Sequence, residues 1–155
     1  IEGDVQAIMA GEAGQQMLDA SNPLQLIQRY VQMVEPLLAQ AMADSWKACH
    51  SSDAIIGTAF TSWGYDIAQK LGIPFYLAAL MPQSATPDFP FPSLPQTLRL
   101  GGRLNSLTYP VLLEGMGLMF RKSINQFRQS TLQLSPLPRW TGLYGRLDKA
   151  GVPYL

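Results

Sequence analysis

The chain contains 155 residues, which is the size of one ordinary domain. Apolar residues make up 47% of it and charged residues only 14%. It is therefore too apolar to be intrinsically disordered, and we expect part of its surface to be covered by another domain, a partner or a membrane. Eleven basic and eleven acidic residues give a formal net charge of zero, which argues against nucleic-acid binding because neutralising phosphates requires clustered lysine and arginine.

The only cysteine and the only histidine are neighbours, Cys49 and His50. A single cysteine rules out a disulfide within the chain and favours a reducing compartment. Two ligands are too few for a metal site, and adjacent residues on a helix point in different directions, so we predict neither a bound metal nor a Cys–His catalytic pair. A long apolar run and a secretory signal pattern are both missing from the sequence. We therefore expect a cytoplasmic location, with peripheral membrane contact as an open alternative.

Helical patterns dominate the first 50 residues. A short helix is predicted within residues 5–18, and a long amphipathic helix from about residue 23 to 49, with Pro23 in its first turn. Its apolar positions recur with a period near 3.6 residues: Leu24, Ile27, Val31, Val34, Leu37, Leu38, Ala41 and Trp46. The sequence opens at Ile1 without a methionine, and we expect it to be part of a longer chain.

A βαβ unit is predicted next. Residues 53–57 and 74–80 are short apolar runs typical of buried parallel strands. Between them, residues 61–71 have one apolar helical face, and Gly72 ends the helix. The order strand, helix, glycine, strand within about 28 residues is typical of a parallel crossover.

The segment from Met81 to Pro95 contains five prolines and should be irregular, because proline is incompatible with regular elements at this density. A long helix is predicted over about 104–134, with Pro110 as a break or kink near its start. Residues 143–145 could open another strand, and residues 151–155 give no prediction.

Four stretches, in chain order, carry a resemblance to one enzyme family. Residues 54–76 contain Gly-x-x-Ile-Ala-x-x-Leu-Gly-Ile-Pro between two strands, and residues 81–90 read Met-Pro-Gln-Ser-Ala-Thr-Pro-Asp-Phe-Pro. Residues 102–109 fit Gly-x-x-Asn-x-x-Thr-Tyr, and residues 124–134 contain Asn-Gln-Phe-Arg followed by Leu-Gln-Leu. Together they resemble the acceptor-binding domain of GT-B glycosyltransferases, in the sterol-type and macrolide-type UDP-sugar branch (family 1/28-like). The opening Gly3–Ala7 fits that domain's third strand-to-helix passage.

The resemblance implies an α/β fold with a Rossmann-like parallel sheet and flanking helices. Residues 1–155 would be the C-terminal part of the acceptor-binding N-terminal domain, with the donor-binding domain absent. The implied reaction is inverting transfer of a hexose from a UDP- or dTDP-sugar to the hydroxyl of a sterol, hopanoid, macrolide or similar lipid-like alcohol. No cofactor or metal is implied, since the nucleotide-sugar is a co-substrate, and we expect the 155 residues alone to be inactive.

The catalytic machinery implied by the resemblance is not in this sequence. The family's base, a histidine or aspartate, lies in the loop after the first strand, which would be in the missing N-terminal segment; we therefore assign no catalytic residue. His50 precedes a strand, which is the wrong end for a base in such sheets. Plant-type relatives carry an orienting aspartate where this chain has Thr58, a departure that favours the sterol-type branch. Without a glycine-rich phosphate loop, we assign no donor-binding residue either.

What remains is a candidate acceptor wall, formed by residues that follow the two strands at their carboxyl ends. Aromatic and methionine side chains offer an adaptable apolar surface, and an amide or hydroxyl could orient the acceptor. The candidates are Phe60, Trp63, Met81, Gln83, Thr86, Phe89 and Phe91. Trp63 fits equally well as a core residue. Phe89 and Phe91 favour ligand or peripheral membrane contact, and a plug beneath the loop is their alternative.

We also expect the polar pairs Arg103–Asn105 and Asn125–Arg128 to fasten the long helix to neighbouring loops; these polar helix–loop contacts are called fasteners below. The competing hypothesis for the whole chain is a non-catalytic α/β module that binds a hydrophobic ligand or a protein partner. A flavodoxin-like or dehydrogenase-like domain is excluded by the missing phosphate loop.

Overall fold

A computed structural model describes residues 23–79, 81–95, 97–98, 100–138, 142 and 145–155 of the chain. The predicted helix within 5–18 and the strand-to-helix passage at 3–7 lie outside the described residues. The chain divides into two compact units, residues 1–48 and 49–155. Helix α3, Pro23–Cys49, accounts for the described part of the first unit and confirms the predicted boundaries. It begins at a proline, whose missing N–H is no loss in a first turn, and Lys47 lies in the last turn, where a cation complements the helix dipole.

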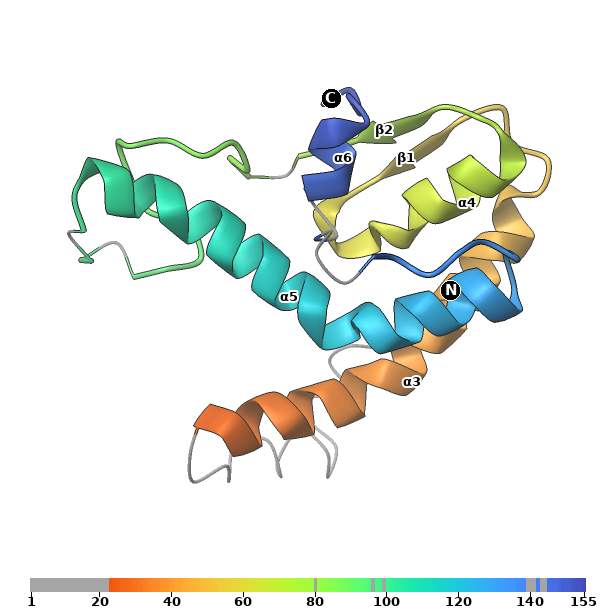
Figure 1. Cartoon of the computed structure of the whole chain (residues 1–155), viewed down its shortest axis with the longest axis horizontal. Coiled ribbons are helices and arrows are strands. Elements are labelled where there is room, and N and C mark those ends of the chain that lie inside the picture. The colour runs from red at the N-terminus through yellow and green to blue at the C-terminus, as the bar shows by residue number, and fades with distance from the viewer. Residues whose placement is uncertain (1–22, 80, 96, 99, 139–141, 143–144) are drawn as a thin grey trace. The chain divides into compact units, whose positions relative to one another are not determined.

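The predicted βαβ unit is present in the second unit (Figure 1). Strand β1, Ile55–Gly57, pairs in parallel with β2, Phe75–Leu77, with Ile55 opposite Phe75. Helix α4, Trp63–Leu71, connects them and packs against both strands. Gly72 ends α4 with a left-handed φ of 68°, a conformation that glycine adopts without steric cost. Both strands are shorter than the predicted 53–57 and 74–80.

The end of the chain forms a third parallel segment, which the sequence did not predict. Tyr154 forms a parallel bridge with Leu77, so β2 has a neighbour on each side. Leu77 N donates to Pro153 O at 2.9 Å, and Leu155 N donates to Leu77 O at 2.9 Å. The described residues of the second unit thus combine helices with a small parallel sheet, which confirms the predicted α/β class.

Residues 81–95 are irregular, as their prolines predict, and are followed by the long helix α5, Gly102–Ser130. This helix begins two residues earlier and ends four residues earlier than predicted. It continues through Pro110, so the expected break is absent. Helix α6, Gly145–Lys149, replaces the strand suggested for 143–145; Leu143 and Tyr144 lie outside the described residues. Glu114 Oε1 accepts a hydrogen bond from Gly145 N at 2.8 Å, and a carboxylate at this position favours a helix start.

A buried ion cluster joins three helices of the second unit. Asp66 on α4 is fully buried and pairs with Arg128 on α5 and with Arg146 on α6. Arg146 Nη2 donates to Asp66 Oδ2 at 2.9 Å, and its guanidinium lies 5.3 Å from the ring centroid of Tyr65. The buried apolar residues of the second unit include Ile55, Trp63, Ile67, Ala68, Phe75, Leu77, Ile124, Phe127, Leu132 and Leu147.

Candidate acceptor site

The carboxyl ends of β1 and β2 lie at the same edge of the sheet because the strands are parallel. After β1, the chain turns through the 3₁₀ helix η1, Ala59–Thr61. Thr58 N donates to Thr61 Oγ1 at 2.8 Å, and Thr61 N donates to Thr58 O at 3.0 Å. Thr58 therefore stabilises this turn locally, at the position where plant-type relatives were expected to carry an aspartate.

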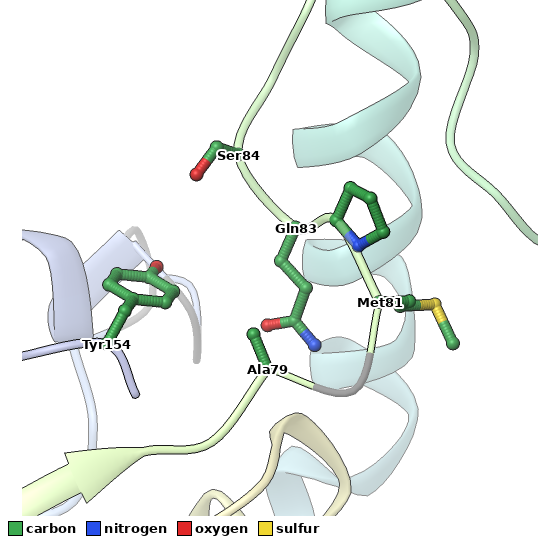
Figure 2. A pocket seen from close by; sticks show the side chains of 6 residues that line it. Ala79, Met81, Gln83, Ser84 and Tyr154 are labelled. Atoms are coloured by element: carbon green, nitrogen blue, oxygen red, sulfur yellow. The ribbon is translucent and has the colours of Figure 1, made fainter.

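An open depression of about 520 Å³ lies at this edge, between the segment that follows β2 and the end of the chain (Figure 2). Its lining combines aliphatic groups with an amide, a hydroxyl and a phenol. The lining residues are Ala79, Met81, Pro82, Gln83, Ser84 and Tyr154. Such a mixture can hold an apolar molecule that carries a few polar groups.

The segment after β2 has two differently lined sides. Gln83 and Ser84 lie on the side of the depression that faces Tyr154, whereas the Met81 side chain points away, toward the α5 ribbon (Figure 2). Met81 is packed against the cluster formed by Phe91, Tyr109 and Leu113. The hydrogen-bonding groups thus line the depression while the thioether anchors the segment to α5.

The loop that continues from this segment is fastened to the first turns of α5 (Figure 1). Asn105 Nδ2 donates to Pro87 O at 2.9 Å, and Phe91 N donates to Thr108 Oγ1 at 2.8 Å. The rings of Phe91 and Tyr109 meet edge to face at a centroid distance of 5.3 Å. These contacts give the wall of the depression a fixed support despite the absence of regular structure.

The helix–loop fasteners expected from the sequence are confirmed at three of the four residues. Asn105 fastens the proline-rich loop, as described above. Asn125 Oδ1 accepts from Leu137 N at 2.8 Å, and Arg128 Nε donates to Ser135 O at 2.9 Å. Arg103 is exposed.

The structure places two of the seven predicted acceptor residues, Met81 and Gln83, in the lining of the depression. Trp63 is buried on α4, in agreement with its alternative role in the core, and Phe60 is 64% exposed on η1. Thr86 Oγ1 donates to Asp88 within the loop at 3.0 Å. None of these three lines the depression. Their roles toward an acceptor stay predictions.

Phe89 and Phe91 occupy opposite environments, although the same role was expected for both. Phe89 is 39% exposed, whereas Phe91 is 4% exposed and packs on Tyr109 and Leu113. The burial of Phe91 fits the alternative of a plug beneath the loop. The sequence missed Ser84, which is adjacent to Gln83, and Tyr154, whose position depends on a strand too short to be recognised.

Burial shapes the titration of two groups. It raises the pKa of the Tyr109 phenol, whose oxygen has no hydrogen-bond partner among the described residues. It also raises the pKa of the Cys49 thiol, which disfavours a reactive thiolate there.

Within the described ranges, no group of three or more His, Cys, Asp or Glu residues could hold a metal ion. The helices in this part of the chain include none that is long and apolar enough to cross a bilayer.

Comparison with known proteins identifies relatives for most of the chain, although no protein-family model matches it. It is 33% identical over 116 residues to a sterol 3-beta-glucosyltransferase of Yarrowia lipolytica and 34% identical over 119 residues to one of Candida albicans. A third, from Debaryomyces hansenii, is 31% identical over 118 residues. These matches cover 75–76% of this chain and 7–8% of each relative's length. The chain is thus a region related to the sterol 3-beta-glucosyltransferases.

Proposed function

We propose that this chain forms part of the acceptor-binding, Rossmann-like domain of a GT-B glycosyltransferase. The complete enzyme would transfer a hexose from a UDP- or dTDP-sugar to the hydroxyl of a sterol or a similar lipid-like alcohol. The observation that carries the proposal is the depression at the carboxyl edge of the sheet, because ligands of open α/β sheets bind there. The names of the related proteins support a sterol as the acceptor.

The lining of the depression suits one face of a sterol with its hydroxyl. The Tyr154 ring and Pro82 provide apolar surface, while the amide of Gln83 and the hydroxyl of Ser84 provide donors and acceptors. A single acceptor hydroxyl needs only one or two such groups to be oriented. Gln83 and Ser84 would therefore position the hydroxyl, and Tyr154 would contact the ring system.

Sugar transfer also requires a base that removes the acceptor proton and positive groups that hold the leaving diphosphate. We place both outside these 155 residues. His50 is the only histidine, and it precedes β1, at the end of the strand away from the depression. We expect neither metal nor cofactor, since the chemistry needs only the acceptor, the nucleotide-sugar and the protein's own groups.

The test is a glucosyltransferase assay on the complete product of the gene, with UDP-glucose and ergosterol or cholesterol as probes. We expect Gln83→Ala to raise the KM for sterol about fivefold, the effect of losing roughly one hydrogen bond, and Tyr154→Ala to raise it further. Matched controls are Gln126→Ala, on the exposed surface of α5, and Tyr30→Ala, an exposed tyrosine of α3. Equal effects of test and control variants would contradict this site.

The alternative, a non-catalytic binding module, has a distinct signature in the same experiment. The described residues supply binding groups at the depression and no base beside it. Sterol binding that is weakened by Tyr154→Ala, together with no transfer from UDP- or dTDP-sugars by the complete gene product, would favour the module.

A further inference from the structure

One face of α5 exposes aliphatic side chains to solvent. We call this the outer stripe; it comprises Leu104, Leu107, Val111 and Leu118, which are 53–66% exposed. Their spacing of three, four and seven residues places them on one side of the helix. The opposite side of the same turns carries Tyr109 and Leu113, which are buried under the proline-rich loop. The first half of α5 is therefore apolar on two sides, although only one of them is covered within the described residues.

The outer stripe ends sharply. Beyond Leu118 the same side of α5 carries Lys122, Asn125, Gln126 and Gln129, so the apolar surface extends only about 21 Å along the axis. If apolar residues were placed at random on an exposed helix face, no such division between an aliphatic and a polar half would be expected. The change from aliphatic to polar residues along one face is typical of a surface covered over part of its length.

The charges around the outer stripe are mainly positive. Arg103 and Lys122 are exposed at its two ends. Glu114 is the only acidic residue of α5, and its carboxylate accepts a hydrogen bond from Gly145 N. Asp88, in the neighbouring loop, is hydrogen-bonded by Thr86. The outer stripe thus combines aliphatic groups with an exposed cation at each end, which complements an anionic surface.

We propose that the outer stripe docks onto the surface of a bilayer that contains anionic lipids. Leucine and valine side chains would enter the boundary between headgroups and acyl chains, and the two cations would lie at the level of the lipid phosphates. This contact lies on a different surface from the loop aromatics expected from the sequence, of which Phe91 is buried and Phe89 is exposed. The proposal goes beyond acceptor binding and does not depend on it.

Vesicle co-sedimentation of the complete chain tests the proposal without sterol. The probes are sterol-free vesicles of phosphatidylcholine alone and of phosphatidylcholine with 30% phosphatidylserine, on the order of the anionic content of a cytoplasmic leaflet. We expect the wild type to prefer the anionic vesicles and to lose that preference at high salt. Leu107→Ser combined with Val111→Ser should lower the partition coefficient about tenfold or more, because two aliphatic side chains no longer enter the bilayer.

Two controls separate membrane contact from general effects. Leu155→Ser, at an equally exposed leucine outside α5, should change the partition coefficient by less than about twofold. Arg103→Gln combined with Lys122→Gln should reduce binding to anionic vesicles about tenfold and leave binding to neutral vesicles unchanged. All variants should unfold at the wild-type temperature, since the substituted side chains are exposed.

Three outcomes would overturn the proposal: a wild type that does not bind vesicles, stripe variants that bind as well as the wild type, or a wild-type dimer that Leu107→Ser and Val111→Ser dissociate in the absence of vesicles. The last would assign the outer stripe to a second copy of the chain. Because sterol is absent throughout, failure here leaves the acceptor-site assay unaffected, and failure of that assay leaves this one unaffected.

Discussion

The two halves of α5 are held in the fold by different forces and present different surfaces. The second half is anchored from inside by the ion cluster of Arg128, Asp66 and Arg146, and its outer face is polar. The first half is anchored by the neutral contacts of Asn105 and Thr108 to a loop, and its outer face is aliphatic. Burying charges favours one arrangement of helices, whereas the aliphatic outer face of the first half is exposed and is the surface proposed above to contact a bilayer.

The largest effect should come from removing the charge at the centre of the anchored half. Asp66→Ala leaves two largely buried arginines without their carboxylate, and we expect a loss of about 3–5 kcal/mol in the free energy of unfolding. Urea unfolding followed by circular dichroism measures it. Asp53→Ala, at an exposed aspartate, is the control and should change stability by less than about 0.5 kcal/mol. Similar losses for both variants would remove the distinction between the two halves.

The matched pair Phe91→Ala and Phe89→Ala examines the neutral anchor of the first half. Phe91→Ala removes the ring that packs against Tyr109 and Leu113 and leaves a cavity. It should lower the free energy of unfolding by about 3 kcal/mol. Phe89→Ala, at the more exposed ring, should cost less than about 1 kcal/mol. Urea unfolding compares the two variants. A larger loss of stability in Phe89→Ala than in Phe91→Ala would show that the loop is packed onto α5 through Phe89 instead.

Smaller effects are expected from the loop fasteners. Thr108→Val keeps the shape but removes the acceptor of the Phe91 amide, so we expect a loss of about 1 kcal/mol. Asn105→Ala should cost less, because it removes the bond to Pro87 O together with a buried amide oxygen that has no partner among the described residues. Hydrogen exchange at the Phe91 amide should accelerate more in Thr108→Val. The reverse order would mean that Asn105 dominates the attachment.

The smallest effect at neutral pH, with a characteristic pH dependence, belongs to Tyr109. Burial raises its pKa in the folded state above the ordinary value of 10.0, so its contribution to stability is complete below pH 10 and is lost as pH rises through the folded-state pKa. Tyr109→Phe removes this alkaline loss. At pH 7 it should leave stability unchanged or raise it by up to about 1 kcal/mol, because the phenol oxygen lacks a partner. Urea unfolding curves at pH 7 and above pH 10 measure both effects. A clear loss of stability in Tyr109→Phe at pH 7 would mean that the hydroxyl is hydrogen-bonded.

Local patterns explain which parts of the fold were predictable. The period of α3, the βαβ unit with Gly72 and the irregular proline-rich segment all depend on neighbouring residues, and all three predictions were confirmed. Helix α5 continues through Pro110, so the break was wrong, while the alternative of a kink stays a prediction; the flanking turns on both sides are long enough to bridge one missing hydrogen bond. The strand expected at 143–145 was wrong at Gly145, since the carboxylate of Glu114, 31 residues earlier, favours a helix start there.

The candidate site was less predictable, because its walls come from distant parts of the chain. Met81 and Gln83 follow a recognisable strand and were predicted; Tyr154 reaches the depression through a bridge to Leu77 that leaves no periodic signal. Composition could not separate Phe89 from Phe91, since their different exposure depends on Tyr109 and Leu113 of a later helix. The ion cluster was missed for the same reason: Asp66 meets Arg128 and Arg146 only in the folded chain.

The bridge between Leu77 and Tyr154 has a consequence for the order of folding. The residues of the β1–α4–β2 unit are synthesised together, but β2 gains its outer neighbour only after a further 77 residues have been synthesised. Until then, one edge of β2 presents bare backbone groups that can recruit strands from other nascent chains. A premature stop a few codons upstream of Tyr154 would make that transient vulnerability permanent.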